Sequence, residues 1–174
     1  MGTGGLWLRK LRAKVAEEPT GFVWVERGKL AGSGFPASRS QLRWLRAQHI
    51  TTILSLTEKP IPEQWLEGLD LEVHHIPMRD HLPPDEASLS QAAEFLKLSL
   101  GKESVVLVHC LAGEGRTGCA IAAYLMFGRR KTAKEAIEDL RRIKPQFIER
   151  GQEAALFELE KMMGGAPVGQ AEHE

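Results

Sequence analysis

Apolar and polar positions along the chain predict strands that alternate with helices. Residues 22–34 hold two short apolar runs on either side of Arg27-Gly28, a pattern typical of two strands joined by a turn. Residues 51–56 and 71–76 are rich in β-branched and apolar side chains, and each predicts one further strand. The run VVLV at 105–108 has no polar position, which is typical of a buried strand.

Capping residues and helical periodicity mark the helices between these strands. Ser38 or Ser40 can cap a helix that runs to about residue 47, and Asp85 or Ser88 can cap a long helix through Leu100. The other helices are predicted at 60–66, at 119–127 with Gly128 at its end, at 132–143 with Thr132 as its cap, and at 149–163.

Residues 110–118 form a glycine-rich loop between the buried strand at 105–108 and the apolar helix that follows. Its glycines permit backbone angles that let consecutive amides converge, and the helix start adds positive potential at the same place. The loop is therefore predicted to bind a phosphate through its backbone. The residues expected to do so are Leu111, Ala112, Gly113, Glu114, Gly115 and Arg116.

Two side chains give this loop its expected chemistry. Arg116 carries a planar fork of donors that can bind two oxygens of a phosphate at once. Cys110 lies at the entrance of the loop, where the same positive field stabilises a thiolate. Reactive cysteines in such places have pKa values of about 3.5–7.5, against about 8.5 for a free cysteine. Cys110 is therefore predicted to be a nucleophile near neutral pH.

Two other interpretations of the loop are weaker. A nucleotide-binding Walker loop needs a lysine after its last glycine, whereas Cys119 follows Gly118 here. His109 and Cys110 could also be the end of a core strand, since free cysteine is among the most buried residue types. A run of His-Cys-x5-Arg-Thr-Gly is too rare by chance to favour that second interpretation.

The segment HCLAGEGRTG at 109–118 resembles the signature of the cysteine-based protein tyrosine phosphatase superfamily. The similarity covers about residues 22–162 and is greatest to the small atypical dual-specificity phosphatases, near the subfamily numbered twenty-three. It also rests on VWVERGKLAGSGFP near the start, on LSLTE at 54–58, and on RRIKP followed by Gln152. The resemblance implies a single-domain α/β phosphatase fold with a mixed, mainly parallel central sheet flanked by helices. The catalytic domain is then expected at 21–163, between an N-terminal extension at 1–20 and a flexible tail at 164–174.

The resemblance also implies a general acid. Enzymes of this superfamily carry it as an aspartate on a movable loop upstream of the nucleophile, often followed by x-x-Pro-Pro, and Asp80 fits that pattern. An acid that protonates the leaving oxygen contributes about 10²–10⁴-fold to the rate. Asp85 and Glu86 are rivals by position alone.

Residues 57–59 follow the strand at 51–56, at the sheet edge where open α/β sheets build sites. Lys59 in this segment is either a substrate contact or a surface lysine.

Three supporting roles follow from the same resemblance. His109 is implied to help set the pKa of the cysteine, and Thr117 to help the thiolate leave. Gln152 corresponds to a glutamine that orients the hydrolytic water, with an ordinary helical glutamine as the alternative. Cys119 could form a protective disulfide with Cys110 under oxidation, but a small core residue is the preferred interpretation.

Composition limits the remaining possibilities. The 174 residues suffice for one domain, and 23 basic side chains balance 23 acidic ones, which argues against a nucleic-acid binder. Two cysteines give no disulfide framework, so a reducing, cytoplasmic location is expected. The protein is also expected to be a monomer. The sequence has no apolar run of about 18 residues that predicts a membrane span. Residues 6–15 could form a basic amphipathic helix that touches a membrane surface, with an ordinary terminal extension as the preferred alternative.

The expected function is a dual-specificity protein phosphatase that works through a cysteinyl-phosphate, without a metal or other cofactor. The only tyrosine, Tyr124, falls in the predicted buried helix, which favours a shallow site open to phosphotyrosine, phosphoserine and phosphothreonine. Glu114 stands where lipid-directed relatives tend to place a basic residue, so protein or aryl phosphates are the expected substrates. Phosphate, sulfate or vanadate are the expected ligands of the loop.

Two other functions stay open. The first is a phosphatase of inositides or another small metabolite with the same chemistry, which the basic stretches at 9–14 and 129–131 favour. The second is a non-catalytic phosphate-binding module. Its mark is the loss of the nucleophile, the arginine or the acid, and Cys110, Arg116 and Asp80 are all present.

Overall fold

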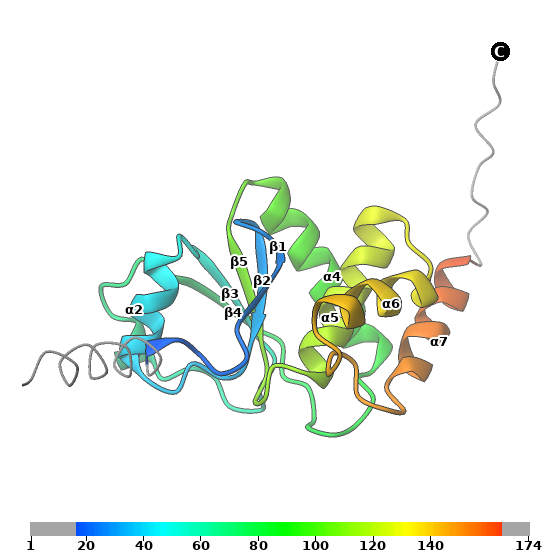
Figure 1. The fold of residues 1–174 in the computed structure, drawn as a ribbon, viewed down its shortest axis with the longest axis horizontal. Coiled ribbons are helices and arrows are strands. Elements are labelled where there is room, and N and C mark those ends of the chain that lie inside the picture. Colours follow the sequence, from blue (N-terminus) through cyan, green and yellow to red (C-terminus); the bar gives the residue numbers. More distant parts are fainter. Residues whose placement is uncertain (1–16, 165–174) are drawn as a thin grey trace, which may run out of the picture.

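Figure 1 shows a computed structural model of the chain, which describes residues 17–164. The segment at 6–15, for which a basic amphipathic helix was the less favoured interpretation, lies outside the described residues. So do most of the predicted extension at 1–20 and of the predicted tail at 164–174.

Five strands form one mixed sheet in the order β1-β2-β5-β3-β4. They are β1 (Val23–Glu26), β2 (Leu30–Ser33), β3 (Thr52–Ser55), β4 (Glu72–His75) and β5 (Val106–His109). β1 pairs antiparallel with β2, and the other three pairings are parallel. This arrangement confirms the predicted α/β fold with a mixed, mainly parallel sheet, and it places β5, which leads into the glycine-rich loop, at the centre.

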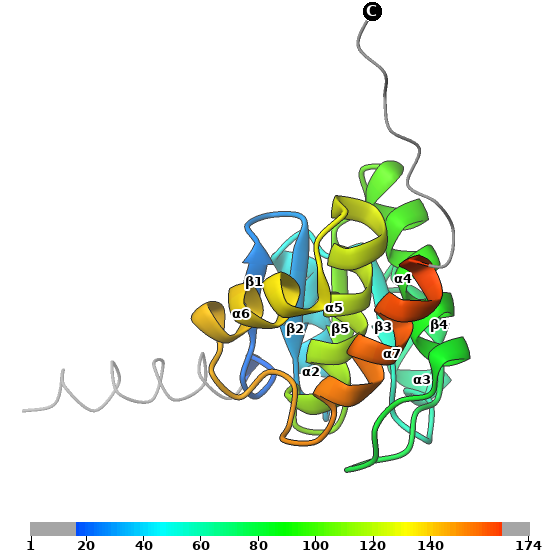
Figure 2. The same cartoon turned by 90° about the vertical axis from the view of Figure 1, so that its right-hand side faces the viewer.

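Helices cover both faces of this sheet. α2 (Arg39–Ala47) and α3 (Glu63–Leu66) pack on one face, and four helices pack on the other (Figures 1 and 2). These four are α4 (Glu86–Gly101), α5 (Gly115–Arg129), α6 (Ala133–Ile143) and α7 (Glu153–Gly164). Within residues 17–164, none of the helices combines the length and the apolar character that a membrane crossing requires.

Side-chain alternation along the strands builds two cores. On β5, Val106 and Val108 face α4–α7, while Leu107 faces α2 and α3. α5 is buried from Gly115 through Met126, because α4, α6 and α7 surround it on the sheet. The helix that follows the glycine-rich loop is therefore the central support of the larger core.

The helix starts follow the predicted caps. Ser38 caps α2 by accepting the amide of Gln41, and Asp85 caps α4 by accepting the amide of Ser88 at 2.9 Å. Thr132 caps α6, and Glu135 binds back to the Thr132 amide to complete a capping box. Each such cap stabilises its helix by about 1 kcal/mol.

Several helix boundaries differ from the prediction. α3 begins at Glu63 rather than at residue 60, and α5 begins at Gly115 rather than at residue 119. α5 does not end at Gly128 but continues to Arg129, and the left-handed residue after it is Arg130, with φ 55°. Gly128 has a packing role instead, because a Cβ there would lie 2.8 Å from a ring carbon of Tyr124. The last helix begins at Glu153 rather than at residue 149, because Gly151 with φ 93° turns the chain first.

Candidate active site

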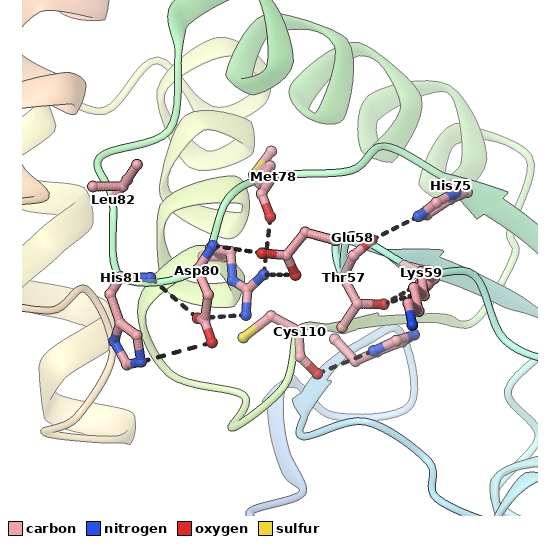
Figure 3. A network of polar contacts seen from close by, with 12 residues as sticks. Thr57, Glu58, Lys59, His75, Met78, Asp80, His81, Leu82 and Cys110 are labelled. Carbon is pink, nitrogen blue, oxygen red and sulfur yellow. Dashed lines mark hydrogen bonds and ion pairs between the residues drawn. The ribbon is translucent and has the colours of Figure 1, made fainter.

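The carboxyl ends of three neighbouring parallel strands bring the candidate residues together. Cys110 directly follows β5, Glu58 lies just beyond the end of β3, and Asp80 lies in the loop after β4. Parallel strands end at the same edge of a sheet, so residues far apart in the sequence meet there. The thiol of Cys110 points toward the polar network that joins Glu58, Met78 and Asp80 (Figure 3).

Four carbonyl groups of the glycine-rich loop accept hydrogen bonds from the rest of the protein or from the following helix. The bonds are His109 Nδ1 to Cys110 O at 3.2 Å, Phe35 N to Leu111 O at 3.0 Å, Lys144 Nζ to Gly113 O at 2.7 Å, and Gly118 N to Glu114 O at 2.8 Å. The N–H of a trans peptide points opposite to its C=O, and the described chain has no cis peptide. The N–H group in the same peptide as each of these carbonyls therefore points away from the group that binds the carbonyl. These are the N–H groups of Leu111, Ala112, Glu114 and Gly115.

One loop amide faces the sulfur directly. Gly113 N–H donates to Cys110 Sγ at 3.3 Å. The first turn of α5 follows at Gly115, and the N–H groups of a first helical turn have no intrahelical acceptors. The contact of the Gly113 amide with the sulfur fits the predicted phosphate-binding loop, whose anion binding stays a prediction.

Gly113 is the glycine on which this loop geometry depends. Its φ of +74° is left-handed, and a Cβ there would lie 2.2 Å from Ser33 C and 2.4 Å from Gly34 N. The loop packs directly on the backbone at the end of β2, so no side chain fits between them.

We expect Gly113→Ala to lower the free energy of unfolding by about 2–4 kcal/mol, from the overpacking and the left-handed backbone together. Gly28→Ala is the matched control, because Gly28 has φ +71° but nothing within 4 Å of a Cβ. It should cost about 1 kcal/mol. Urea denaturation measures both losses, and equal losses would show that the close approach to β2 is unimportant.

Arg116 is buried at the start of α5 and is 2% exposed. Its Nη1 donates to Met78 O at 2.9 Å and to Glu58 Oε2 at 3.2 Å, and its Nη2 donates to Asp80 Oδ1 at 2.5 Å. The guanidinium is therefore fixed by partners from two other loops rather than free to rotate. A buried arginine with planar donors is well suited to bind a phosphate in a single orientation.

Glu58 joins the arginine to the loop that carries Asp80. Its Oε2 accepts from Arg116, and its Oε1 accepts the backbone N–H of Asp80 at 2.9 Å. This backbone hydrogen bond is the largest of the effects that lower the pKa of Glu58. Glu58 lies at the sheet edge predicted from the sequence, but no role was predicted for it, because nothing local in LSLTE indicates a partner in the loop after β4.

The structure separates Asp80 from its two rivals. Asp80 bonds Arg116 through its carboxylate, as described above, whereas the carboxylate of Asp85 accepts from the Ser88 amide and hydroxyl as the cap of α4. Glu86 lies in the first turn of that helix. Asp80 is thus the one of the three whose carboxylate lies on the arginine.

Gln152 is buried between the glycine-rich loop and the loop after β4. Its Nε2 donates to Leu82 O at 3.2 Å, and its Oε1 accepts from the Glu149 amide at 3.1 Å. A Cβ on Gly115 would lie 2.5 Å from Oε1. The glutamine side chain therefore lies beside the loop and connects it to the segment that carries Asp80.

Cys119 lies in the core behind the loop. Its thiol is fully buried and donates to Gln152 Oε1 at 3.6 Å. Burial raises the pKa of this thiol, which disfavours the thiolate that disulfide exchange needs. Its place favours the preferred interpretation, a small core residue.

His109 and Thr117 are both fully buried. A carbonyl oxygen only accepts, so the short contact with Cys110 O means that His109 Nδ1 carries the hydrogen. His109 Nε2 and Thr117 Oγ1 have no hydrogen-bond partner among the described residues. Burial lowers the pKa of His109 to about 4, so the ring is neutral at physiological pH.

This pKa predicts a pH-dependent stability. His109 is protonated near pH 6.5 in the unfolded chain but only near pH 4 in the folded chain. Its contribution to the free energy of unfolding is therefore fully present above about pH 6.5 and is lost as the pH falls to about 4. The loss is about 3 kcal/mol. In urea denaturation across this pH range, His109→Asn should remove this part of the slope, and the exposed control His49→Asn should keep it. Identical slopes in all three proteins would contradict a buried neutral imidazole.

Lys144, just after α6, is a second residue that the sequence analysis did not assign. Its ammonium donates to Gly113 O at 2.7 Å and to Gly21 O at 3.3 Å.

Across residues 17–164, the structure brings together no group of three or more His, Cys, Asp or Glu side chains that could hold a metal ion.

A family model described as "Swiss Army Knife protein, DSP-PTPase phosphatase domain" matches residues 19–156. The chain belongs to this DSP-PTPase family. The match confirms the predicted membership of the cysteine-based protein tyrosine phosphatase superfamily. The closer resemblance to subfamily twenty-three stays a prediction.

Individual relatives of this DSP-PTPase agree with the family. The dual specificity protein phosphatase Mpk3 of Drosophila melanogaster is 34% identical over 102 residues, which cover 58% of this chain and 25% of Mpk3. The dual specificity protein phosphatase CDC14C of Homo sapiens is 29% identical over 107 residues, covering 62% of this chain and 23% of CDC14C. The chain thus spans about a quarter of the length of these relatives.

Solved structures share the fold of the DSP-PTPase. Tk-PTP in its active form superposes with a TM-score of 0.72 at 28% identity, covering 80% of this chain and 96% of Tk-PTP. PTPMT1 in complex with PI(5)P superposes with a TM-score of 0.72 at 20% identity, covering 83% of this chain and 97% of PTPMT1. The second likeness concerns the fold alone.

Proposed function

We propose that this DSP-PTPase is a dual-specificity protein phosphatase that hydrolyses phosphotyrosine and phosphoserine or phosphothreonine esters through a cysteinyl-phosphate. The observation that carries the proposal is the direct bond between Arg116 and Asp80, beside a loop whose Gly113 amide donates to the Cys110 sulfur. These contacts support a site in which Cys110 is the nucleophile, Arg116 binds the phosphate and Asp80 donates the proton.

In the first step, the Cys110 thiolate attacks phosphorus in line with the leaving oxygen, and the P–O bond to that oxygen breaks. The loop amides and Arg116 hold the three equatorial oxygens, as fixed donors stabilise a transition state without reorganising. A phosphate on Arg116 displaces Asp80 Oδ1 from the guanidinium, while Glu58 keeps the backbone of Asp80 in place. The carboxyl of Asp80 is then free to protonate the leaving oxygen.

In the second step, water hydrolyses the cysteinyl-phosphate. Asp80, now ionised, takes a proton from the water, the oxygen of the water bonds to phosphorus, and the S–P bond breaks to release inorganic phosphate and the thiolate. The Thr117 hydroxyl is buried and has no hydrogen-bond partner among the described residues, which suits it to donate a hydrogen bond to the departing thiolate. Gln152, which lies over Gly115, is the residue proposed to place the water.

The substrate class follows from the side chains on the loop. Glu114 adds a negative charge beside the phosphate site, which repels a second or third phosphate group on the same molecule. Leu111, 61% exposed next to the nucleophile, offers an apolar contact to the rest of the substrate. Both features favour an aryl or peptide phosphate over a polyphosphorylated inositide, the alternative substrate with the same chemistry.

The test is a substrate panel with the purified protein. Phosphate release from p-nitrophenyl phosphate in the presence of EDTA is expected, followed by release from phosphotyrosine and phosphothreonine peptides and slower release from inositide phosphates. No release from any of these substrates would favour a non-catalytic phosphate-binding module. Faster release from inositides than from peptides would favour the metabolite phosphatase.

Glu114→Lys tests whether the charge at position 114 selects among these substrates. Exchanging the negative charge for a positive one should raise kcat/KM for inositide bisphosphates by about tenfold and change that for a phosphotyrosine peptide by less than about threefold. Glu103→Lys is the control, because Glu103 lies exposed in the turn between α4 and β5, and its substitution makes the same change of net charge. Equal effects of the two variants would remove Glu114 from substrate selection.

A further inference from the structure

Lys144 contacts the backbone of the glycine-rich loop at 110–118. Its Nζ donates to the carbonyl of Gly113 at 2.7 Å and to that of Gly21 at 3.3 Å, and it lies 5.4 Å from the ring centroid of Phe147. The two carbonyls come from the loop and from the segment before β1. One ammonium group therefore ties the loop to a part of the chain that is remote in sequence.

The contact with Gly113 fixes an amide. Gly113 O and the N–H of Glu114 belong to one trans peptide and point in opposite directions. Because Lys144 holds the carbonyl on the outer side, the Glu114 amide is turned to the inner side, where phosphate binds. The Gly113 amide, in the preceding peptide, already donates to Cys110 Sγ at 3.3 Å. Lys144 thus holds the peptide next to the one that contacts the sulfur.

The charge of Lys144 is also close to the site. The two hydrogen bonds of its ammonium go to carbonyl groups, those of Gly113 and Gly21. Partial burial lowers the pKa of Lys144, while the charges of Glu114 and Cys110 act in the opposite direction. The fold thus keeps a half-buried cation directly behind the loop that binds a dianion, although its desolvation is unfavourable.

We propose that Lys144 is a positioning residue of the phosphatase, which orients the Glu114 amide toward the substrate phosphate and adds positive potential beneath the Cys110 loop. This inference rests on the proposed function and names a part of the same site. It predicts that removal of the ammonium weakens phosphate binding and thiolate reactivity even where the fold is intact.

The experiment is the alkylation of Cys110 by iodoacetamide, followed by mass spectrometry across a range of pH and of inorganic phosphate concentration. For Lys144→Met, the phosphate concentration that protects Cys110 should rise by about tenfold, and the pH midpoint of alkylation should move upward. Lys144→Arg, which keeps the charge and the donors, should recover most of the protection. Lys161→Met, an exposed lysine paired with Glu158 on α7, is the control and should behave as the wild type.

Circular dichroism and urea denaturation check that each variant is folded, and Lys144→Gln replaces the methionine variant if that one is not. Unchanged protection and an unchanged pH midpoint in a folded Lys144→Met or Lys144→Gln protein would overturn the proposal. Because alkylation needs no turnover, this result is distinct from failure of the proposed function, which would appear as a wild type without hydrolysis of p-nitrophenyl phosphate.

Discussion

Cys110→Ser is expected to lower kcat by about 10⁴-fold or more while the protein still binds phosphate. The hydroxyl of serine is not ionised in this site, so the nucleophile is lost, but the amides and Arg116 that hold the anion remain. Steady-state hydrolysis of p-nitrophenyl phosphate measures the loss, and calorimetric titration with inorganic phosphate measures the binding.

Cys119→Ser is the matched control for this variant. Cys119 is fully buried on α5, and a serine hydroxyl can donate to Gln152 Oε1 as the thiol does. Its kcat should stay within about threefold of the wild type, since a small change in the core costs little where its hydrogen bond is kept. Substantial turnover by Cys110→Ser, or equal losses in both variants, would contradict the assignment of the nucleophile.

Asp80→Asn is expected to separate good leaving groups from poor ones. The amide cannot donate an acidic proton, so kcat/KM for phenyl phosphate should fall by about 10²–10³-fold, while p-nitrophenyl phosphate should lose about tenfold or less. We expect a bell-shaped profile of kcat/KM against pH in the wild type, and Asp80→Asn should lose its limb on the alkaline side, which reports the acid.

Asp85→Asn provides the comparison for the acid. Asp85 is close in sequence but caps α4 through the Ser88 amide, so its substitution should affect stability by about 1 kcal/mol or less and leave the leaving-group dependence unchanged. If Asp80→Asn lowered kcat/KM for both esters equally, Asp80 would have a role in binding or folding and not as the acid.

Local signals in the sequence were sufficient for most of the fold. The strand at 106–109, the caps at Ser38 and Thr132, and the position of the loop follow from hydrophobic runs and from short-range hydrogen bonds. These features depend on residues within a few positions of one another, which periodicity and capping rules describe. The predicted end of α5 at Gly128 was wrong, because Gly128 is needed for packing against Tyr124 and not for a left-handed turn.

The parts of the site that could not be predicted are contacts between distant segments. Arg116 and Glu58 are 58 positions apart, and Lys144 and Gly113 are 31 apart. Each pair meets because parallel strands and the helices between them end at one edge of the sheet, a fact that only the topology supplies. Asp80 could be proposed from its resemblance to an acid-loop pattern, but its bond to Arg116 required the structure.

The most direct test of this account is the capture of the covalent intermediate. The protein is mixed with a phosphotyrosine peptide, quenched in acid within the first turnover, digested and analysed by tandem mass spectrometry. The account predicts one phosphoryl group on the peptide that carries Cys110, and none in the Cys110→Ser protein treated in the same way. Rapid hydrolysis with no phosphoryl group on Cys110, or with the group on another residue, would contradict it.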